Sequence, residues 1–230
     1  MNELKYAAKD AIDFADAMKE QKGKLYADVK VNLIIGNNAT ITNILKGLEW
    51  LHKQTTPNDI AILSGHGRNG PTGTYYYLPV DADTKSLIDT AVPSTTITNM
   101  ITTLNGRKIL FIDTCRAGNS LHGTTAVAAD IKPIINELLA AGSRAVVFAS
   151  SDEKQESKEH YDWKNGAFTK AVVEGIRGKA DTTNTRKFTI NMLDTHISET
   201  VRDLTKGNQT PITYKHGVPD YSIAIFDVIR

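Results

Sequence analysis

Strand-like apolar runs alternate along this chain with segments whose apolar residues recur at helical spacing. A helix between two strands lets the strands lie side by side in the same direction. The order therefore predicts an α/β fold with a mostly parallel central sheet flanked by helices. We expect a Ser or Thr cap on the helix over 94–104. The expected helices are 7–19, 40–54, 94–104, 126–141, 166–176 and 190–204, and the expected strands are 29–35, 75–80, 144–149, 223–228 and the runs that begin at Ile60 and Ile109.

Length and composition fit one packed domain. The chain has 230 residues, of which 40% are hydrophobic and 23% charged, and its net charge is +1. Near-neutral charge without a basic run gives no sign of a nucleic-acid or membrane partner. The single cysteine excludes an internal disulfide framework and suits a reducing compartment. Since no apolar run approaches the ~20 residues of a membrane span and no signal-peptide pattern opens the chain, we expect a cytoplasmic protein.

Two of the expected strands end in reactive residues. The run that begins at Ile60 leads into Gly65-His66-Gly67, and the run that begins at Ile109 leads into Asp113-Thr114-Cys115. In parallel sheets, functional residues gather just past the carboxyl ends of the strands. We therefore expect His66 and Cys115 to lie at the same edge of the sheet.

These residue types can support nucleophilic catalysis. A cysteine thiolate is a strong nucleophile, and a neighbouring imidazole can take the proton of the thiol. His66 could then return a proton to a leaving amine. The backbone N–H groups of Gly67 and Cys115 would stabilise a developing oxyanion. Alone, a cysteine or histidine at a strand end is more often structural, but the shared strand context favours a catalytic dyad.

At these positions the chain resembles the caspase-like cysteine peptidases, and especially the metacaspase-like branch found in bacteria. In caspases a histidine about 50 residues upstream of the cysteine is typical. The residues that carry the resemblance are 63–67 around His66, 111–118 around Cys115, 4–11, 78–81, 148–151 with Gln155 and Ser157, and 166–169.

The resemblance implies a fold and a reaction. It implies a three-layer α/β sandwich formed by a single domain over 1–230, with a large-subunit-like half over 1–125 and a small-subunit-like half over 126–230. It implies peptide hydrolysis through a thioester on Cys115. The family's first strand has no counterpart in the sequence, so a strand over 29–35 would lack its usual neighbour.

The resemblance also implies a specificity. True caspases carry Gln two residues before the cysteine and cleave after Asp, whereas this chain has Asp113 at that position. In metacaspases this acid and one from the first helix, here matched by Asp10, line a pocket for Arg or Lys. Paired carboxylates favour a cation and repel an acidic side chain. We expect a protein or peptide substrate cleaved after a basic residue, and a sensor or regulatory partner is plausible.

The sequence also bears on calcium binding and on activation by self-cleavage. No resident cofactor or metal is expected. Some metacaspases need Ca²⁺, and Asp81 and Asp152 lie near plausible positions, so activation by calcium stays open. The segment 181–192 has Arg and Met where a calcium-binding EF-hand loop needs Gly and Glu, which argues against a metal site there. Residues 117–131 contain no Lys or Arg, so an enzyme selective for basic residues would leave this segment uncut. Lys154, Lys158 and Lys164 are the alternative sites for self-cleavage.

Two other functions compete with an active peptidase. One is a catalytically silent caspase-like scaffold or regulatory module. The other is an α/β nucleotide- or effector-binding domain that uses Gly65-His66-Gly67. No GxGxxG or GxxxxGK[ST] pattern follows a strand, which disfavours the nucleotide-binding alternative.

Overall fold

The computed structural model describes residues 5–70, 72–83, 85–114, 131–151, 155 and 157–225. The chain forms two compact units. The first unit contains the described residues of Ile34–Glu156 and Ile212–Val218, and the second contains those of Leu4–Leu33, Ser157–Pro211 and Pro219–Arg230. The predicted division of the chain near residue 125 falls outside the described residues and stays a prediction.

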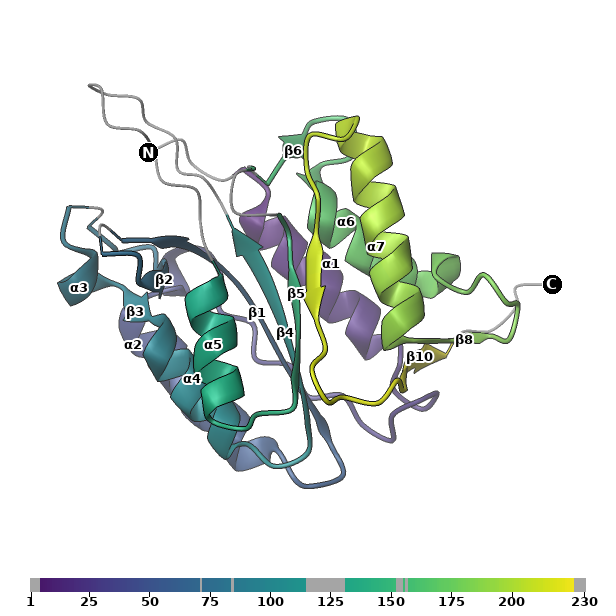
Figure 1. Ribbon diagram of the computed structural model, residues 1–230, viewed down its shortest axis with the longest axis horizontal. Coiled ribbons are helices and arrows are strands. Elements are labelled where there is room, and N and C mark those ends of the chain that lie inside the picture. The colour runs from purple at the N-terminus through teal and green to yellow at the C-terminus, as the bar shows by residue number, and fades with distance from the viewer. Residues whose placement is uncertain are drawn as a thin grey trace. The chain divides into compact units, whose positions relative to one another are not determined.

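A six-stranded sheet forms the centre of the first unit (Figure 1). Its two longest pairings are parallel: β4 lies between β1 and β5 and runs in the same direction as both. Short antiparallel pairings add β2, β3 and β9. The mostly parallel sheet predicted from the sequence is confirmed. In spatial order the strands are β3 (Val92–Pro93), β2 (Tyr75–Tyr77), β1 (Ile60–Asn69), β4 (Arg107–Thr114), β5 (Ala145–Ala149) and β9 (Ile212–Tyr214).

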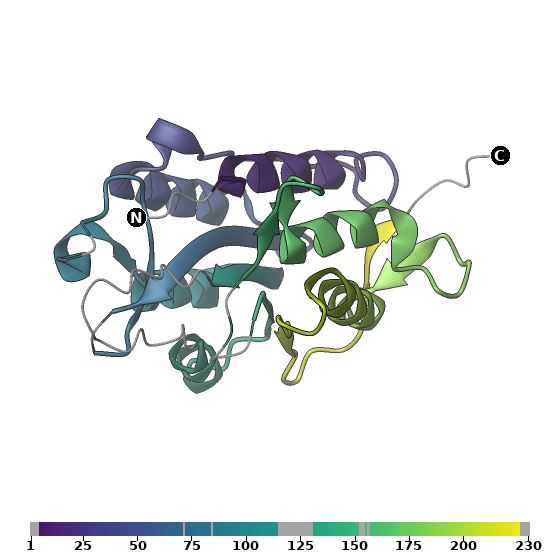
Figure 2. The same ribbon diagram turned by 90° about the horizontal axis from the view of Figure 1, so that it is seen from above.

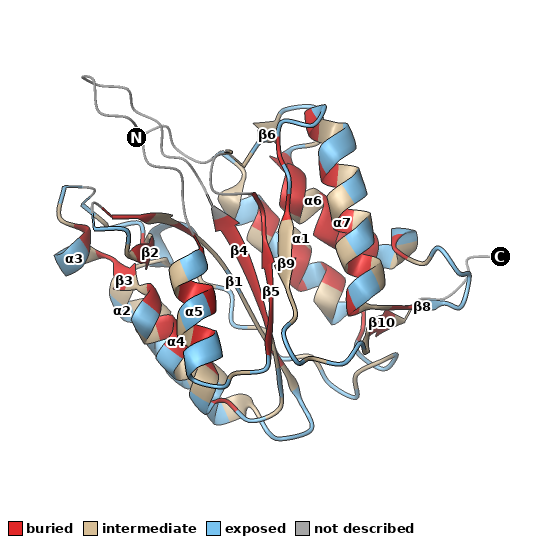
Figure 3. Cartoon of the chain, viewed as in Figure 1, coloured by how far each residue is buried: buried red, intermediate tan, exposed pale blue. Residues whose placement is uncertain are grey.

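Three helices of the first unit, α2, α4 and α5, pack on this sheet through a shared apolar core. Leu48 of α2, Ile101 of α4 and Ile134 of α5 share a cluster with Leu110 of β4 and Val147 of β5. Figure 3 shows β4 and β5 as buried strands, as expected for the middle of a covered sheet. The helices of this unit are η1 (Gly36–Asn38), α2 (Ile41–Gln54), α3 (Leu87–Thr90), α4 (Ser94–Thr103) and α5 (Lys132–Ala140), and Leu87 of α3 lies in a separate small cluster with Tyr76 and Ala91.

The second unit is built around α6, which packs against α1 and α7 (Figures 1 and 2). Phe14 of α1, Phe168 of α6 and Leu193 of α7 are buried. The elements are α1 (Ala7–Lys19), β6 (Glu159–His160), β7 (Asn165–Gly166), α6 (Ala167–Glu174), the π-helical turn η2 (Gly175–Lys179), β8 (Lys187–Thr189), α7 (Ile190–Thr205) and β10 (Ser222–Ile225). Among the described residues, no helix is long and apolar enough to cross a membrane.

Several sequence predictions need correction. The segment 29–35 forms no strand, and no strand partner is present for it among the described residues. An extended segment without a partner leaves its backbone groups outside any ladder, so the strand-like residue pattern does not suffice. The helix α4 starts after Pro93, and no side chain caps it. The last predicted strand is β10, which pairs with β8 rather than with the six-stranded sheet.

Candidate active site

The register between β1 and β4 places His66 directly opposite Asp113. The two strands are parallel, so both residues lie toward their carboxyl ends, where a functional site was expected. Gly67 and Thr114 form the next and last pair of this ladder. The chain reaches Cys115 one residue later, but Cys115 lies outside the described residues.

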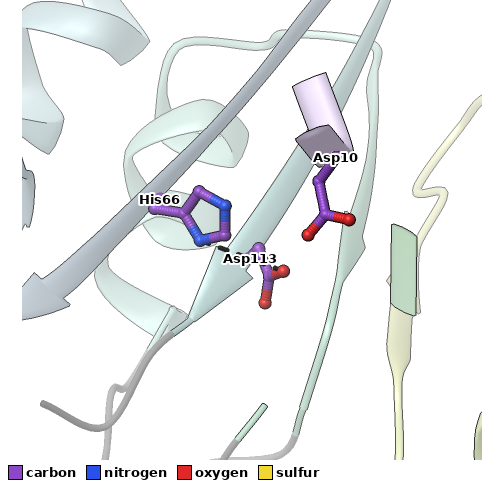
Figure 4. A group of neighbouring side chains, drawn as sticks. All are labelled: Asp10, His66 and Asp113. Atoms are coloured by element: carbon purple, nitrogen blue, oxygen red, sulfur yellow. Dashed lines mark ion pairs between the residues drawn. The ribbon is translucent and has the colours of Figure 1, made fainter. Parts of the chain in front are cut away.

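The side chains of His66 and Asp113 face each other across the two strands (Figure 4). Nδ1 of His66 lies 3.9 Å from Oδ2 of Asp113, which is too long for a hydrogen bond. Asp113 is only 6% exposed. Among the described residues, neither Nδ1 of His66 nor Oδ1 of Asp113 has a hydrogen-bond partner. Buried polar atoms without partners are unfavourable, so this pair favours a donor or a cation that satisfies the carboxylate.

Small residues around His66 let aromatic side chains of β2 approach the strand. A Cβ on Gly67 would lie 2.4 Å from the carbonyl oxygen of Tyr76 and 2.5 Å from the ring of Tyr75, so no side chain fits at this position. The carbonyl oxygen of His66 accepts a hydrogen bond of 3.1 Å from the N–H of Leu78. The backbone that carries His66 is therefore fixed on both sides. The proposed oxyanion role of Gly67 remains a prediction.

Tyr77 lies close to His66, and the sequence pattern gave no sign of this proximity. Its ring would lie 3.2 Å from a Cβ on Gly65, one residue before His66. Tyr77 packs edge-on against Tyr75, with 5.4 Å between ring centroids. Burial raises the pKa of the Tyr77 phenol, since the charged form would lose its hydration. The two tyrosines thus give the strand beside His66 an apolar wall, which strengthens local electrostatic interactions.

Asp10 lies in the second unit, on the first turn of α1. Its side chain is buried, and its carboxylate accepts hydrogen bonds from the backbone N–H of Gly166, at 3.1 and 3.2 Å, and from Nδ2 of Asn165, at 2.8 Å. These bonds tie α1 to the start of α6. Asp10 therefore has a structural role in its own unit, and its predicted pairing with Asp113 stays a prediction.

Asp13 extends the hydrogen-bond network of Asp10. Nδ2 of Asn165 also donates to Oδ2 of Asp13 at 2.7 Å, and Lys9 forms an ion pair with the same carboxylate. Burial alone would raise the pKa of Asp13, but the hydrogen bonds from Lys9 and Asn165 outweigh it, so the pKa is lowered. Asn165 thus joins two carboxylates of one helix to the β6–β7 hairpin.

The acidic residues considered for calcium have local structural partners where they are described. Oδ1 of Asp81 accepts a hydrogen bond of 3.3 Å from the N–H of Ile41, at the start of α2. Asp181 accepts hydrogen bonds from the N–H groups of Thr183, at 3.1 Å, and Arg186, at 2.8 Å, within its own loop. Asp152 lies outside the described residues. Dependence on calcium stays a prediction for experiment.

Comparison with known proteins places these observations in a family context. The caspase domain is the family whose sequence model matches the chain, over residues 1–221. No curated protein matches the chain.

Solved structures show the same fold at low sequence identity. A crystal structure of a protein from Geobacter sulfurreducens is 15% identical, with a TM-score of 0.63, and the match covers 95% of this chain and 86% of that one. Caspase-1 from Spodoptera frugiperda is 12% identical, with a TM-score of 0.57, and covers 92% of this chain and 79% of its own. The structure of pro-Sf-caspase-1 is 15% identical, with a TM-score of 0.52 and coverages of 89% and 77%. At these identities the likeness concerns the fold.

Proposed function

This chain belongs to the caspase domain family, and we propose that it is a cysteine endopeptidase that cleaves peptide bonds after Arg or Lys. In this proposal Cys115 is the nucleophile, and His66 is the general base and acid. The observation that carries the proposal is the pairing of half-buried His66 with buried Asp113 at the carboxyl ends of β1 and β4, with only Thr114 between Asp113 and Cys115 in the sequence. The pair joins an imidazole to a buried carboxylate, one oxygen of which has no hydrogen-bond partner among the described residues.

The proposed reaction proceeds in two stages. The thiol proton of Cys115 passes to Nε2 of His66, and the sulfur attacks the carbonyl carbon of the substrate. The backbone N–H groups of Gly67 and Cys115 stabilise the oxyanion. As the C–N bond breaks, His66 gives its proton to the leaving amine, and a thioester remains. Water then loses a proton to His66 and attacks the thioester, which releases the acid and restores the thiol.

A basic specificity follows from the charge of Asp113. A buried carboxylate oxygen without a partner is stabilised by a guanidinium or ammonium group and destabilised by a second carboxylate. Asp10 is the proposed second carboxylate of the same pocket. Since true caspases carry Gln where this chain has Asp113, we place the chain with the metacaspase-like branch. We propose a cytoplasmic location, with which the single cysteine is compatible, and a regulatory partner protein is a further part of the proposal.

Fluorogenic peptides that end in Arg, Lys or Asp test this proposal, with and without Ca²⁺. We expect turnover after Arg and Lys, and we expect the matched Cys115→Ala variant to have none. Turnover after Asp would retain the dyad but overturn the basic specificity. Folded protein that cleaves no peptide in either condition would favour a silent scaffold. A rate that needs Ca²⁺ would assign the ion an activating role.

A further inference from the structure

The His66–Asp113 pair has a second consequence, which concerns the proton of the imidazole. A neutral histidine carries one N–H, on either Nδ1 or Nε2, and its hydrogen bonds decide which. Nδ1 of His66 faces Oδ2 of Asp113 at 3.9 Å and has no hydrogen-bond partner among the described residues. An ionised carboxylate can accept a hydrogen bond but has no hydrogen to donate. The carboxylate therefore favours the tautomer with the proton on Nδ1.

The backbone holds the two side chains opposite each other. His66 and Asp113 are direct partners in the β1–β4 ladder, and the close approach of Tyr76 to Gly67 prevents the strand from shifting toward β2. The present distance of 3.9 Å is longer than the 2.7–2.9 Å typical of a charge-assisted hydrogen bond. Catalytic hydrogen bonds are often long before a substrate binds.

We propose that Asp113 is a positioning residue that keeps the proton of His66 on Nδ1, so that Nε2 is free to take the thiol proton of Cys115. The inference rests on the proposed role of His66 as the base. It gives Asp113 two uses: Oδ2 orients the imidazole, and Oδ1 remains for the basic side chain of the substrate. The wrong tautomer would present an N–H to the thiol and could not accept its proton.

His160 provides an internal contrast within the same chain. It also lies beside a carboxylate, with Nδ1 at 3.3 Å from Oδ2 of Asp162, but both side chains are substantially exposed. Nδ1 of His160 accepts a hydrogen bond of 3.2 Å from the backbone N–H of Asp162. Neutral His160 must therefore carry its proton on Nε2, the opposite of what we expect for His66.

Nitrogen-15 NMR of the two imidazoles distinguishes these tautomers. The spectra are recorded on the Cys115→Ala protein at about pH 8.5, about two units above the reference histidine value of model peptides. We expect the Nδ1–H form for His66 and the Nε2–H form for His160. Asp113→Asn offers an amide N–H to Nδ1 and should move His66 to the Nε2–H form without changing His160. Asp113→Glu restores a carboxylate and should return His66 toward the Nδ1–H form.

The inference is overturned if His66 has the Nε2–H form in the parent protein. It is equally overturned if folded Asp113→Asn leaves the tautomer unchanged. Should Asp113→Asn fail to fold, the tautomer of the parent protein decides alone.

Alkylation by iodoacetamide gives a second readout that needs no peptide substrate. The sulfur–carbon bond forms, the carbon–iodine bond breaks, iodide leaves, and the thiol proton moves to Nε2 of His66. Since Cys115 is the only cysteine, the rate reports this thiol without background. We expect Asp113→Asn to slow alkylation by about tenfold or more, and the matched Asp162→Asn variant to leave it unchanged. Equal rates for Asp113→Asn and the parent protein would overturn the inference.

The two experiments also separate this inference from the proposed function. Protein that cleaves no peptide but shows the Nδ1–H form and slowed alkylation in Asp113→Asn would retain the positioning role while the peptidase proposal fails. Protein that cleaves after Arg with His66 in the Nε2–H form would retain the peptidase proposal and overturn the positioning role.

Discussion

Gly67 and Tyr76 approach each other so closely that a Cβ on Gly67 would lie 2.4 Å from the carbonyl oxygen of Tyr76. The obstacle is backbone, which cannot rotate away as a flexible side chain can. Gly67→Ala should therefore force β1 and β2 apart and lower the free energy of unfolding by about 1–3 kcal/mol. Because His66 precedes Gly67, peptidase activity should fall as well.

Urea unfolding checks this prediction, with Gly65→Ala as the matched control in the same strand. Among the described residues, a Cβ on Gly65 would meet only the ring of Tyr77, at 3.2 Å, and an aromatic ring can shift by a few tenths of an ångström. The control should lose clearly less stability. Equal losses for the two variants would show that the backbone contact at Gly67 is not the cause.

Asp10 should contribute to the stability of the second unit whether or not it contacts substrate. Asp10→Ala removes the acceptor of the buried N–H of Gly166 and one of the two acceptors of the Asn165 amide, which keeps its bond to Asp13. Hydrogen bonds to charged groups contribute about 1.5–3 kcal/mol, so the free energy of unfolding should fall by a similar amount. Asp16→Ala, on the exposed side of the same helix, should change it by less than about 0.5 kcal/mol. Urea unfolding of both variants measures the difference, and an unchanged Asp10→Ala protein would contradict the structural role.

His196 should make stability depend on pH. This residue of α7 packs over Gly175, and burial lowers its pKa from 6.5; Lys179 adds to the shift, while Glu174 opposes it. Between 6.5 and the lower folded pKa, the unfolded chain binds more protons than the folded one. The contribution of His196 is therefore complete above 6.5 and is lost as the pH falls through that window.

Urea unfolding from about pH 8 to about pH 5 tests this dependence. His196→Gln should show a smaller loss of stability on acidification than the parent protein. The exposed His52→Gln variant, on α2, should show the parent's loss. A parent-like loss in His196→Gln would assign the dependence to other groups.

Local sequence pattern predicted the elements that depend on local interactions. The helices α1 and α2 carry apolar residues at helical spacing, and Thr40 caps α2 by accepting a hydrogen bond from the N–H of Asn43. Continuous apolar residues predicted β1 and β4 because both lie within a covered sheet. The strand β9 has only three residues and is defined by its pairing with β5, so no periodicity could reveal it.

For the candidate site, too, the sequence predicted the local features but not the contacts between distant segments. Strand ends placed His66 and Asp113 at one edge, but the register that makes them direct partners depends on how two distant segments pair. The partners of Asp10 were not predictable, because Asn165 lies 155 residues away in the sequence. The strand-like pattern of 29–35 shows the converse, since a strand also needs a neighbour that the pattern cannot supply.

The segment 117–131 should stay intact in active protein, because it contains no Lys or Arg. Two of the alternative self-cleavage sites, Lys158 and Lys164, have backbone groups that are engaged in hydrogen bonds. The N–H of Lys158 donates to Oε1 of Gln209, and the carbonyl oxygen of Lys158 accepts from the N–H of Ala167, both at 2.8 Å. The N–H of Lys164 donates to the carbonyl oxygen of His160 within the β6–β7 hairpin. A protease binds an extended chain, so these bonds should protect both residues.

Intact-mass spectrometry of concentrated protein after prolonged incubation measures self-cleavage directly. We expect the full-length mass to persist, as it should in the Cys115→Ala control. A minor product cut after Lys154 would agree with basic specificity, because Lys154 is a basic residue and the segment 117–131 would still be intact. Cleavage inside 117–131 that depends on Cys115 would contradict the proposed selectivity for Arg and Lys, since the protein would then have cut after a residue other than Arg or Lys.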